Sequence, residues 1–249
     1  MSEIDYDHVS NRHSLEGPEA ALRLLFAKGV PASLLDVGCG TGTWLKASYD
    51  AGVSEVFGID GVDIPMENLL FPESQFQQMD FSKPIDLGRR FDVVLCLEVG
   101  EHLEKESAST LIDSLTTHSD YVIFSAACPD QPGQHHVNCQ WPEYWQNLFN
   151  KRGYVCSDKV RWDLWANETI EPWYRQNMFT ARYSPDEAGN EPRISDVIHP
   201  AMLTWLACDP RGRFYSENAV SIAKGRLPFT WYLTVPFRAL AAKFINRVR

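Results

Sequence analysis

The 249-residue sequence lacks paired cysteines, a leader-like start and any long apolar run. Its 6 cysteines are scattered without a C-x-x-C pair. The first residues contain no apolar stretch that resembles a signal peptide. The longest apolar and aromatic run covers only residues 227–237 and includes two prolines, whereas a bilayer core requires about 20 residues. We therefore expect no membrane span and a reducing, cytoplasmic compartment.

Positive charge is also scarce. The chain has 23 Lys and Arg against 33 Asp and Glu, a net charge of −10, so the molecule should repel a phosphate backbone and nucleic acid is not favoured as a partner. The charge is uneven, because residues 1–210 carry 15 basic and 32 acidic side chains (−17) and residues 211–249 carry 8 and 1 (+7). The tail is therefore expected to have a different neighbour from the body.

Short apolar runs alternate with longer helical patterns along the body. The runs expected as strands are residues 33–37, 55–59, 76–79, 92–97 and 121–125. The patterns expected as helices are residues 18–28, 43–51, 64–71, 103–117 and 141–151. Two later segments, 154–160 and 176–183, are expected to pair antiparallel, before a polar loop or linker at 184–193. The pattern predicts an α/β fold with a mostly parallel sheet closed by an antiparallel hairpin.

Residues 34–42 form an expected buried strand that runs into a glycine-rich turn, with Gly38, Gly40 and Gly42. Glycine permits positive φ and lets backbone N–H groups approach a ligand at a helix N-terminus. A dinucleotide fingerprint needs a further glycine at position 43, where Thr43 stands, and this argues against a nicotinamide-dependent oxidoreductase or epimerase. The G-x-G-x-G spacing resembles that of class I S-adenosylmethionine-dependent methyltransferases.

This resemblance implies a Rossmann-like sheet of seven strands over residues 18–183, between a flexible segment at 1–17 and a linker with a basic extension at 184–249. Asp60 ends the second strand, where a carboxylate can bind both ribose hydroxyls. Asp80 and Phe81 resemble the pair that meets adenine in this family. The residues expected to bind S-adenosylmethionine are Asp36, Gly38, Gly40, Gly42, Asp60, Asp80 and Phe81. Each could instead have a purely structural role: the glycines could form a tight turn, Asp60 could cap a helix or form a turn, and Phe81 could pack in the core.

The fourth strand leads into an E-x-x-E-H sequence. On a helical turn, Glu98, Glu101 and His102 would share one face, and two carboxylates with an imidazole suit Mg²⁺ or Mn²⁺. The arrangement resembles that of ubiquinone-pathway O-methyltransferases and of enzymes that methylate the 2′-hydroxyl at small-RNA 3′ ends. In the latter, a histidine from beyond the next strand completes the magnesium site. The alternative is a solvated helix start.

His135 and His136 follow the fifth strand in the loop where such a histidine is expected. We take His136 as the fourth ligand and His135 as general base or supporting residue, although the two roles can be exchanged and the pair can also simply stabilise the loop. The expected activity is O-methylation of a hydroxyl on a sugar, glycoconjugate or other small metabolite, assisted by a divalent cation. The alternatives are RNA 2′-O-methylation and a non-catalytic module that keeps the cofactor fold.

The basic tail contains a helical apolar stripe over residues 236–249, flanked on both sides by Lys and Arg. This layout is typical of a helix that lies in a membrane interface. It is equally typical of a terminal helix that docks on the acidic body or on a dimer partner. The sequence does not set the oligomeric state.

Overall fold

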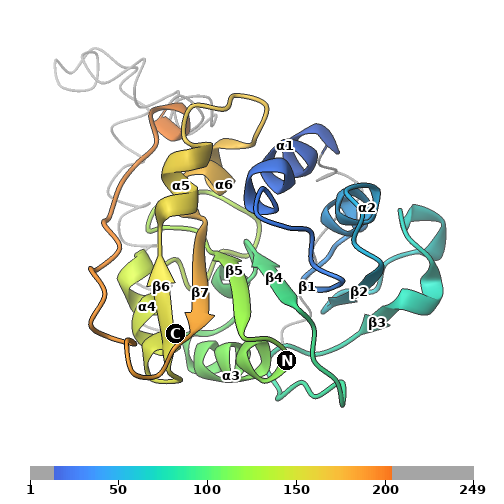
Figure 1. The fold of residues 1–249 in the computed structure, drawn as a ribbon, viewed down its shortest axis with the longest axis horizontal. Helices are drawn as coiled ribbons and strands as arrows, with labels where there is room; N and C mark the ends of the chain where they lie inside the picture. Colours follow the sequence, from blue (N-terminus) through green and yellow to red (C-terminus); the bar gives the residue numbers. More distant parts are fainter. Residues whose placement is uncertain (1–13, 204–249) are drawn as a thin grey trace, which may run out of the picture. The chain divides into compact units, whose positions relative to one another are not determined.

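A computed structural model of the protein describes residues 14–203 (Figure 1). Its sheet is 7-stranded with the order β3-β2-β1-β4-β5-β7-β6. The strands are β1 (Ser33–Val37), β2 (Glu55–Asp60), β3 (Phe76–Gln78), β4 (Val93–Leu97), β5 (Tyr121–Ser125), β6 (Tyr154–Ser157) and β7 (Phe179–Tyr183). β1 to β5 pair in parallel, and β7 is antiparallel to both β5 and β6. The predicted fold class is confirmed.

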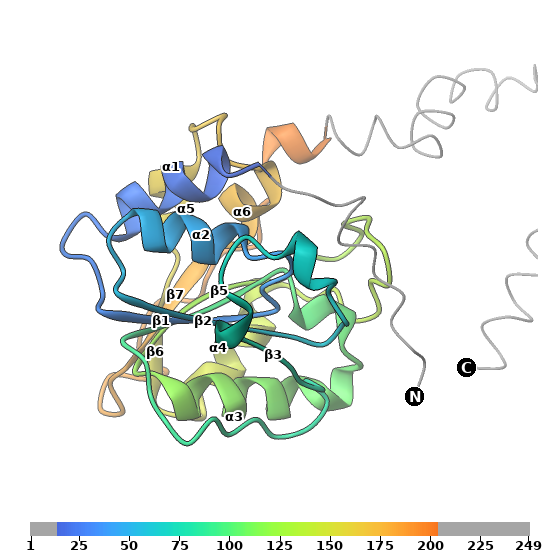
Figure 2. The ribbon, with the colours of Figure 1, turned by 90° about the vertical axis from the view of Figure 1, so that its right-hand side faces the viewer.

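Helices cover both faces of this sheet (Figure 2). They include α1 (Glu16–Leu25), α2 (Thr43–Asp50), α3 (Ala108–His118), α4 (Pro142–Asn150), α5 (Lys159–Leu164) and α6 (Pro172–Asn177). α1, α2, α5 and α6 lie on one face, and α3 and α4 lie on the other. Alternate residues of each strand point to opposite faces, so Leu34 and Leu95 join one core cluster whereas Leu35 and Val94 join the other. The central strands are therefore apolar on both sides.

Four of the five expected crossover helices form, and the one predicted at residues 64–71 is wrong. That segment contains only the short 3₁₀ turn η1 (Met66–Asn68), because Pro65 and Pro72 stand on either side of it and restrict the helical backbone. The Leu70 N–H instead donates to the Thr41 carbonyl at 2.9 Å, which ties the segment to the glycine turn. A second difference is that α3 begins at Ala108, after two 3₁₀ turns, and not at residue 103.

The two antiparallel segments are shorter than the sequence indicates. β6 ends at Ser157 because α5 begins two residues later, and β7 begins only at Phe179 because α6 extends to Asn177. Residues 159–160 and 176–177, which were expected to be strand, therefore belong to the helices α5 and α6. This shift places the last residues of α6 beside the site described below.

The compact unit continues to Met202, beyond the boundary that composition places at residue 183. The Glu191 carboxylate accepts hydrogen bonds from Gln146 Nε2 at 2.9 Å and from the Cys156 N–H at 3.2 Å. Ile194 is buried in the core. Residues 184–193 were expected to be a loop or linker, and Glu191 in this segment bonds residues of α4 and β6.

Residues 1–13 and 204–249 lie outside the described part of the chain, and with them the basic stripe at 236–249. Within residues 14–203, none of the helices combines the length and the apolar character that a membrane crossing needs.

Candidate active site

The glycine turn connects β1 to α2 at the carboxyl edge of the sheet. Gly38, Gly40 and Gly42 have φ values of 81°, 52° and 88°, which side-chain-bearing residues rarely adopt. The N–H groups of Gly38 and Cys39 both donate to the Ile59 carbonyl, at 2.8 and 3.1 Å, so the turn is fixed to the end of β2. The turn therefore needs all three predicted glycines, and it ends directly at the N-terminus of α2.

The Asp60 carboxylate lies between this turn and the loop after β2. Its Oδ2 accepts the Gly40 N–H at 2.8 Å and its Oδ1 accepts the Val62 N–H at 2.9 Å. Asp36, at the end of the neighbouring strand, is buried, and its Oδ2 has no hydrogen-bond partner among the described residues. Burial and the nearby Asp60 charge raise the pKa of Asp36 to about 8.

Asp80 and Phe81 follow β3 and point in different directions. Phe81 is buried in the core, and its ring lies close to Gly61, the residue after Asp60. Asp80 is exposed and accepts hydrogen bonds from the Ser82 N–H and hydroxyl, at 3.0 and 2.6 Å. These bonds, together with Lys83, lower the pKa of Asp80 to about 2. Only Phe81 thus adjoins the Asp60 turn, and the adenine role of the pair stays a prediction.

The E-x-x-E-H sequence was expected to form an α-helical turn, and it does not. β4 ends at Leu97, Glu98 takes a positive φ of 56°, and the 3₁₀ turn η3 (Gly100–His102) follows. A Cβ on Gly100 would lie 2.5 Å from the Trp145 ring, so this close packing requires glycine. The positive φ at Glu98 takes it out of the predicted helical face, although its carboxyl group still neighbours that of Glu101, which is adjacent to His102 on η3.

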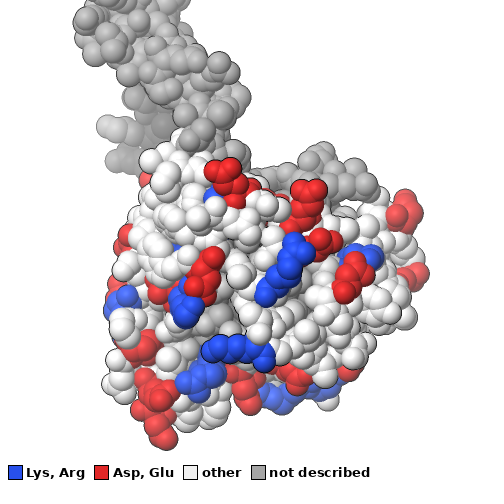
Figure 3. Space-filling model, turned by 45° about the horizontal axis from the view of Figure 1, so that its top comes forward, with Lys and Arg blue, Asp and Glu red and all other residues white. Residues whose placement is uncertain are grey.

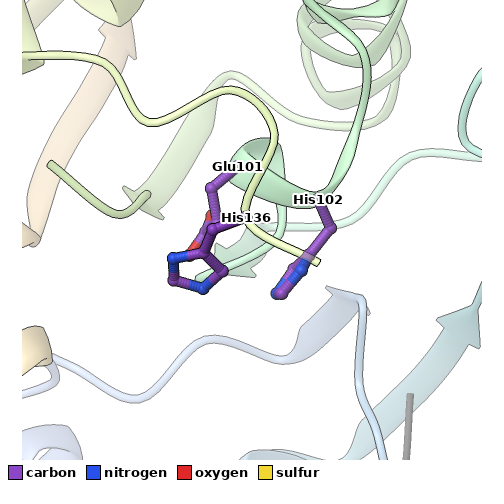
Figure 4. A group of neighbouring side chains, drawn as sticks. All are labelled: Glu101, His102 and His136. Atoms are coloured by element: carbon purple, nitrogen blue, oxygen red, sulfur yellow. The ribbon is translucent and has the colours of Figure 1, made fainter. Parts of the chain in front are cut away.

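Glu101, His102 and His136 converge, and Figure 4 shows that their side chains point into the same space. Each offers one ligand atom, and these atoms all lie within 4.8 Å of one another. The loop that carries His136 is fastened to η3, because the Glu101 carbonyl accepts the N–H groups of Val137 and Asn138 at 2.9 and 3.0 Å. We call these three residues the Glu-His-His group.

Burial dominates the electrostatics of this group. Both carboxylate oxygens of Glu101 are buried without a hydrogen-bond donor among the described residues. Burial and the neighbouring Glu98 carboxylate raise the pKa of Glu101 well above its usual range. Burial and then the nearby His136 lower the pKa of His102 to about 4, and burial also lowers the pKa of His136. The imidazoles are therefore neutral at pH 7, the form that binds metal ions.

His135 and Glu98 lie outside the Glu-His-His group. His135 has a φ of 55°, and its carbonyl oxygen lies 3.3 Å from His102 Nδ1, so its backbone supports the ring of a neighbour. The His136 Nδ1 lies 2.9 Å from the Gln131 carbonyl, where it can donate, which leaves its Nε2 as the lone-pair nitrogen. Of the two exchangeable roles, the structure brings His136 into the group and leaves His135 outside it.

The glycine turn packs against the segment that leads into the Glu-His-His group. A Cβ built on Gly38 would lie 2.3 Å from Val99 Cγ2, and Val99 stands between Glu98 and η3. The two halves of the predicted site are therefore neighbours at the carboxyl ends of β1 and β4, where ligands of open α/β sheets bind.

Comparison with known proteins decides the family. Residues 10–183, well over half of the chain, match the family described as "Methyltransferase domain". The chain belongs to this family of methyltransferases. Two solved structures share its fold: DesVI from Streptomyces venezuelae (TM-score 0.53, 15% identity, 72% of this chain and 100% of that chain) and the methyltransferase domain of bacterial CtHen1 (TM-score 0.51, 17% identity, 69% and 100%). No curated protein matches the chain in sequence.

The protein is an S-adenosylmethionine-dependent methyltransferase. The N–H groups of Gly38, Cys39 and Gly40 are bonded within the protein, to Ile59 and Asp60, whereas one Asp36 oxygen is buried without a hydrogen-bond partner among the described residues. The contact of Asp36, Asp60 and the three glycines of the methyltransferase with the donor stays a prediction.

Sequence reasoning missed two amide side chains of this methyltransferase. Gln131 and Asn177 donate to the Glu98 carboxylate and are almost fully buried. Gln131 stands in the same loop as the two histidines, which was the only signal available. Asn177 was hidden because its segment was expected to be a strand, and it instead ends α6.

Proposed function

We propose that the protein is an O-methyltransferase that acts on a hydroxyl of a sugar, glycoconjugate or other small metabolite with the help of a divalent cation. The observation that supports this most is the convergence of Glu101, His102 and His136 directly beside the glycine turn. A cation-binding group in that place lies where an acceptor must meet the methyl donor. Transfer from a sulfonium needs mainly in-line alignment of oxygen, carbon and sulfur and exclusion of water.

The residues present fit a divalent cation. The two Glu101 oxygens are buried without a donor, which is costly for a carboxylate unless a charge compensates it. One carboxylate and two neutral imidazoles suit Mn²⁺, Fe²⁺ or Co²⁺ as well as Mg²⁺. We assign Glu101, His102 and His136 as ligands, with the Glu98 carboxylate beside Glu101 adding negative charge. A cation bound there would supply Lewis-acid activation of the acceptor hydroxyl.

The other roles fall to side chains around the group. Asp60 and the glycine turn hold the donor, and the η3 turn sets the direction of approach. His135, on the same loop as His136, is our candidate for taking the acceptor proton, as a general base. Because it lies outside the Glu-His-His group, its loss should lower turnover without weakening cation binding.

The charge of the chain favours a small acceptor over nucleic acid. The net charge is −10. On the face seen in Figure 3, Asp and Glu are interspersed with Lys and Arg, and the described residues of that face form no continuous basic surface. Such a surface attracts a phosphate backbone poorly.

The test is methyl transfer from isotope-labelled S-adenosylmethionine to a panel of sugars, glycosides and phenols, followed by mass spectrometry, with and without EDTA. We expect transfer to stop in EDTA and to return with Mg²⁺ or Mn²⁺. Glu101→Gln and His136→Ala should abolish the response to metal. The matched controls, Glu106→Gln on the exposed surface and His135→Ala on the same loop, should retain it.

Other outcomes would replace the proposal. Full turnover in EDTA, with no metal detected in the protein, removes the cation from it. Transfer only to an RNA 3′ end, included in the panel, replaces the acceptor class. Binding of S-adenosylhomocysteine without transfer to any acceptor would favour a module that keeps the cofactor fold without the reaction.

A further inference from the structure

A buried cradle of amide groups surrounds the Glu98 carboxylate. Asn177 Nδ2 lies 3.1 Å from Glu98 Oε1 and 3.3 Å from Oε2, and Gln131 Nε2 donates to Oε2 at 2.8 Å. Asn177 Nδ2 also lies 2.9 Å from Gln131 Oε1, which links the two amides to each other. Asn177 is 3% exposed and Gln131 is 7% exposed. Solvent therefore cannot substitute for these donors.

The cradle is hydrogen-bonded, through Gln176, to His199 in the segment that follows β7. Gln176 Nε2 donates to Asn177 Oδ1 at 3.0 Å, and Gln176 Oε1 accepts the His199 N–H at 2.8 Å. His199 is itself buried, and its Nε2 lies 2.8 Å from the Trp165 carbonyl. A continuous line of hydrogen bonds thus runs from Glu98 through α6 to residues beyond the matched family region, which ends at 183.

This network has a specific physical task. Half-buried Glu98 and buried Glu101 are neighbours, and a carboxyl group in such a place depends on fixed hydrogen-bond donors for its orientation. The amide donors of Asn177 and Gln131 contact both Glu98 oxygens and so fix the plane of the carboxyl group.

We propose that Asn177, together with Gln131, is a positioning residue that holds the Glu98 carboxylate beside Glu101 and so prepares the Glu-His-His group for a divalent cation. This inference rests on the proposed function, because it assigns Asn177 a role toward the cation that the group is proposed to bind. Replacement of a residue that hydrogen-bonds a metal ligand typically changes metal affinity or activity by about 10- to 100-fold, and because these two amides bond Glu98, the neighbour of the Glu101 ligand, we expect the lower end of that range. Asn177 touches neither the acceptor nor the donor in this scheme.

The chain offers a matched control for a purely structural role. Gln146 is also a fully buried amide, and it donates at 2.9 Å to another carboxylate, that of Glu191. It lies on α4, on the opposite face of the sheet from α6 (Figure 2). Gln146→Ala should therefore lower the stability without affecting the cation.

The experiment measures Mn²⁺ affinity of the full-length protein by electron paramagnetic resonance of free Mn²⁺. We expect Asn177→Ala and Gln131→Ala each to weaken Mn²⁺ binding about 10-fold, the lower end of the range for residues that support metal ligands. S-adenosylhomocysteine affinity, measured by calorimetry, should stay within about twofold of the wild type. Gln146→Ala should bind Mn²⁺ as the wild type does. If Asn177→Ala does not fold, Gln131→Ala, which alters a loop, carries the test.

Two negative results have different meanings. Wild-type Mn²⁺ affinity in both cradle variants, with a loss of thermal stability like that of Gln146→Ala, would overturn the positioning role and leave the proposed function intact. A wild-type protein that binds no Mn²⁺ would overturn the cation-assisted function, and the positioning role with it.

Discussion

Replacement of Asp36 by Asn should remove a large pH dependence from the stability of the protein. Asp36 is 2% exposed, one of its carboxylate oxygens has no hydrogen-bond partner among the described residues, and its pKa in the folded chain is about 8 against 3.8 for an ordinary Asp. Asn has nearly the same shape and carries no titratable proton. The variant therefore isolates the ionisation from the packing.

The sign and size follow from proton linkage. Between pH 4 and 8 the folded protein keeps the Asp36 proton while the unfolded chain releases it, so the free energy of unfolding falls as the pH rises. The slope approaches about 1.4 kcal/mol per pH unit for one proton. Between pH 5 and 7, the wild type should lose about 2.7 kcal/mol relative to Asp36→Asn. Below pH 4, where both states are protonated, this contribution disappears.

The assay is urea unfolding of cofactor-free protein at pH 5, 6 and 7, followed by tryptophan fluorescence. Asp186→Asn, at an exposed position, shows whether removal of any negative charge has the same effect. If the wild type and Asp36→Asn lose stability in parallel over this range, Asp36 ionises at its ordinary pKa, and the argument from burial is refuted.

Three further predictions concern the donor site, the glycine turn and the domain boundary. Asp60→Ala should weaken S-adenosylhomocysteine binding by about 2–3 kcal/mol, or roughly 30- to 150-fold, in calorimetry. An unchanged affinity in folded protein would show that Asp60 does not bind the ribose. Gly38→Ala should unfold at lower urea than Gly88→Ala, because both have positive φ but only the first Cβ meets a neighbour, Val99 Cγ2 at 2.3 Å; equal losses would contradict the close approach. Ile194→Ala should lower the free energy of unfolding by about 2–4 kcal/mol, against less than about 1 kcal/mol for Ile198→Ala, which is 39% exposed; similar small losses would return residues after 183 to a linker.

The sequence was sufficient for the features that depend on local chemistry. The strand ends before Gly38 and at Asp60 were predictable because apolar runs followed by glycine or an acid have few structural solutions in a parallel sheet. The antiparallel β7 followed from its position after Gly153. The helix expected at 64–71 failed because its apolar spacing was weighed more heavily than Pro65 and Pro72.

The rest of the site depends on tertiary contacts that spacing cannot encode. The i, i+3, i+4 rule placed Glu98 with Glu101 and His102, but a positive φ at Glu98 turns it toward α6. Asn177 lies 79 residues from Glu98 in sequence, so only the packing of α6 against the sheet reveals the pair. The choice of His136 as the member of the group likewise depends on how the loop is fastened to η3.

The position of β7 has a consequence for how the chain is made. β7 lies between β5 and β6, so the hydrogen-bonding edge of β5 stays uncovered until residues 179–183 have been synthesised. β5 is apolar on both faces, and an uncovered apolar edge readily pairs with another chain. During translation, the chain must be synthesised as far as residue 183 before this edge is closed. Nascent chains that stall before residue 179 should therefore be the species most dependent on chaperones.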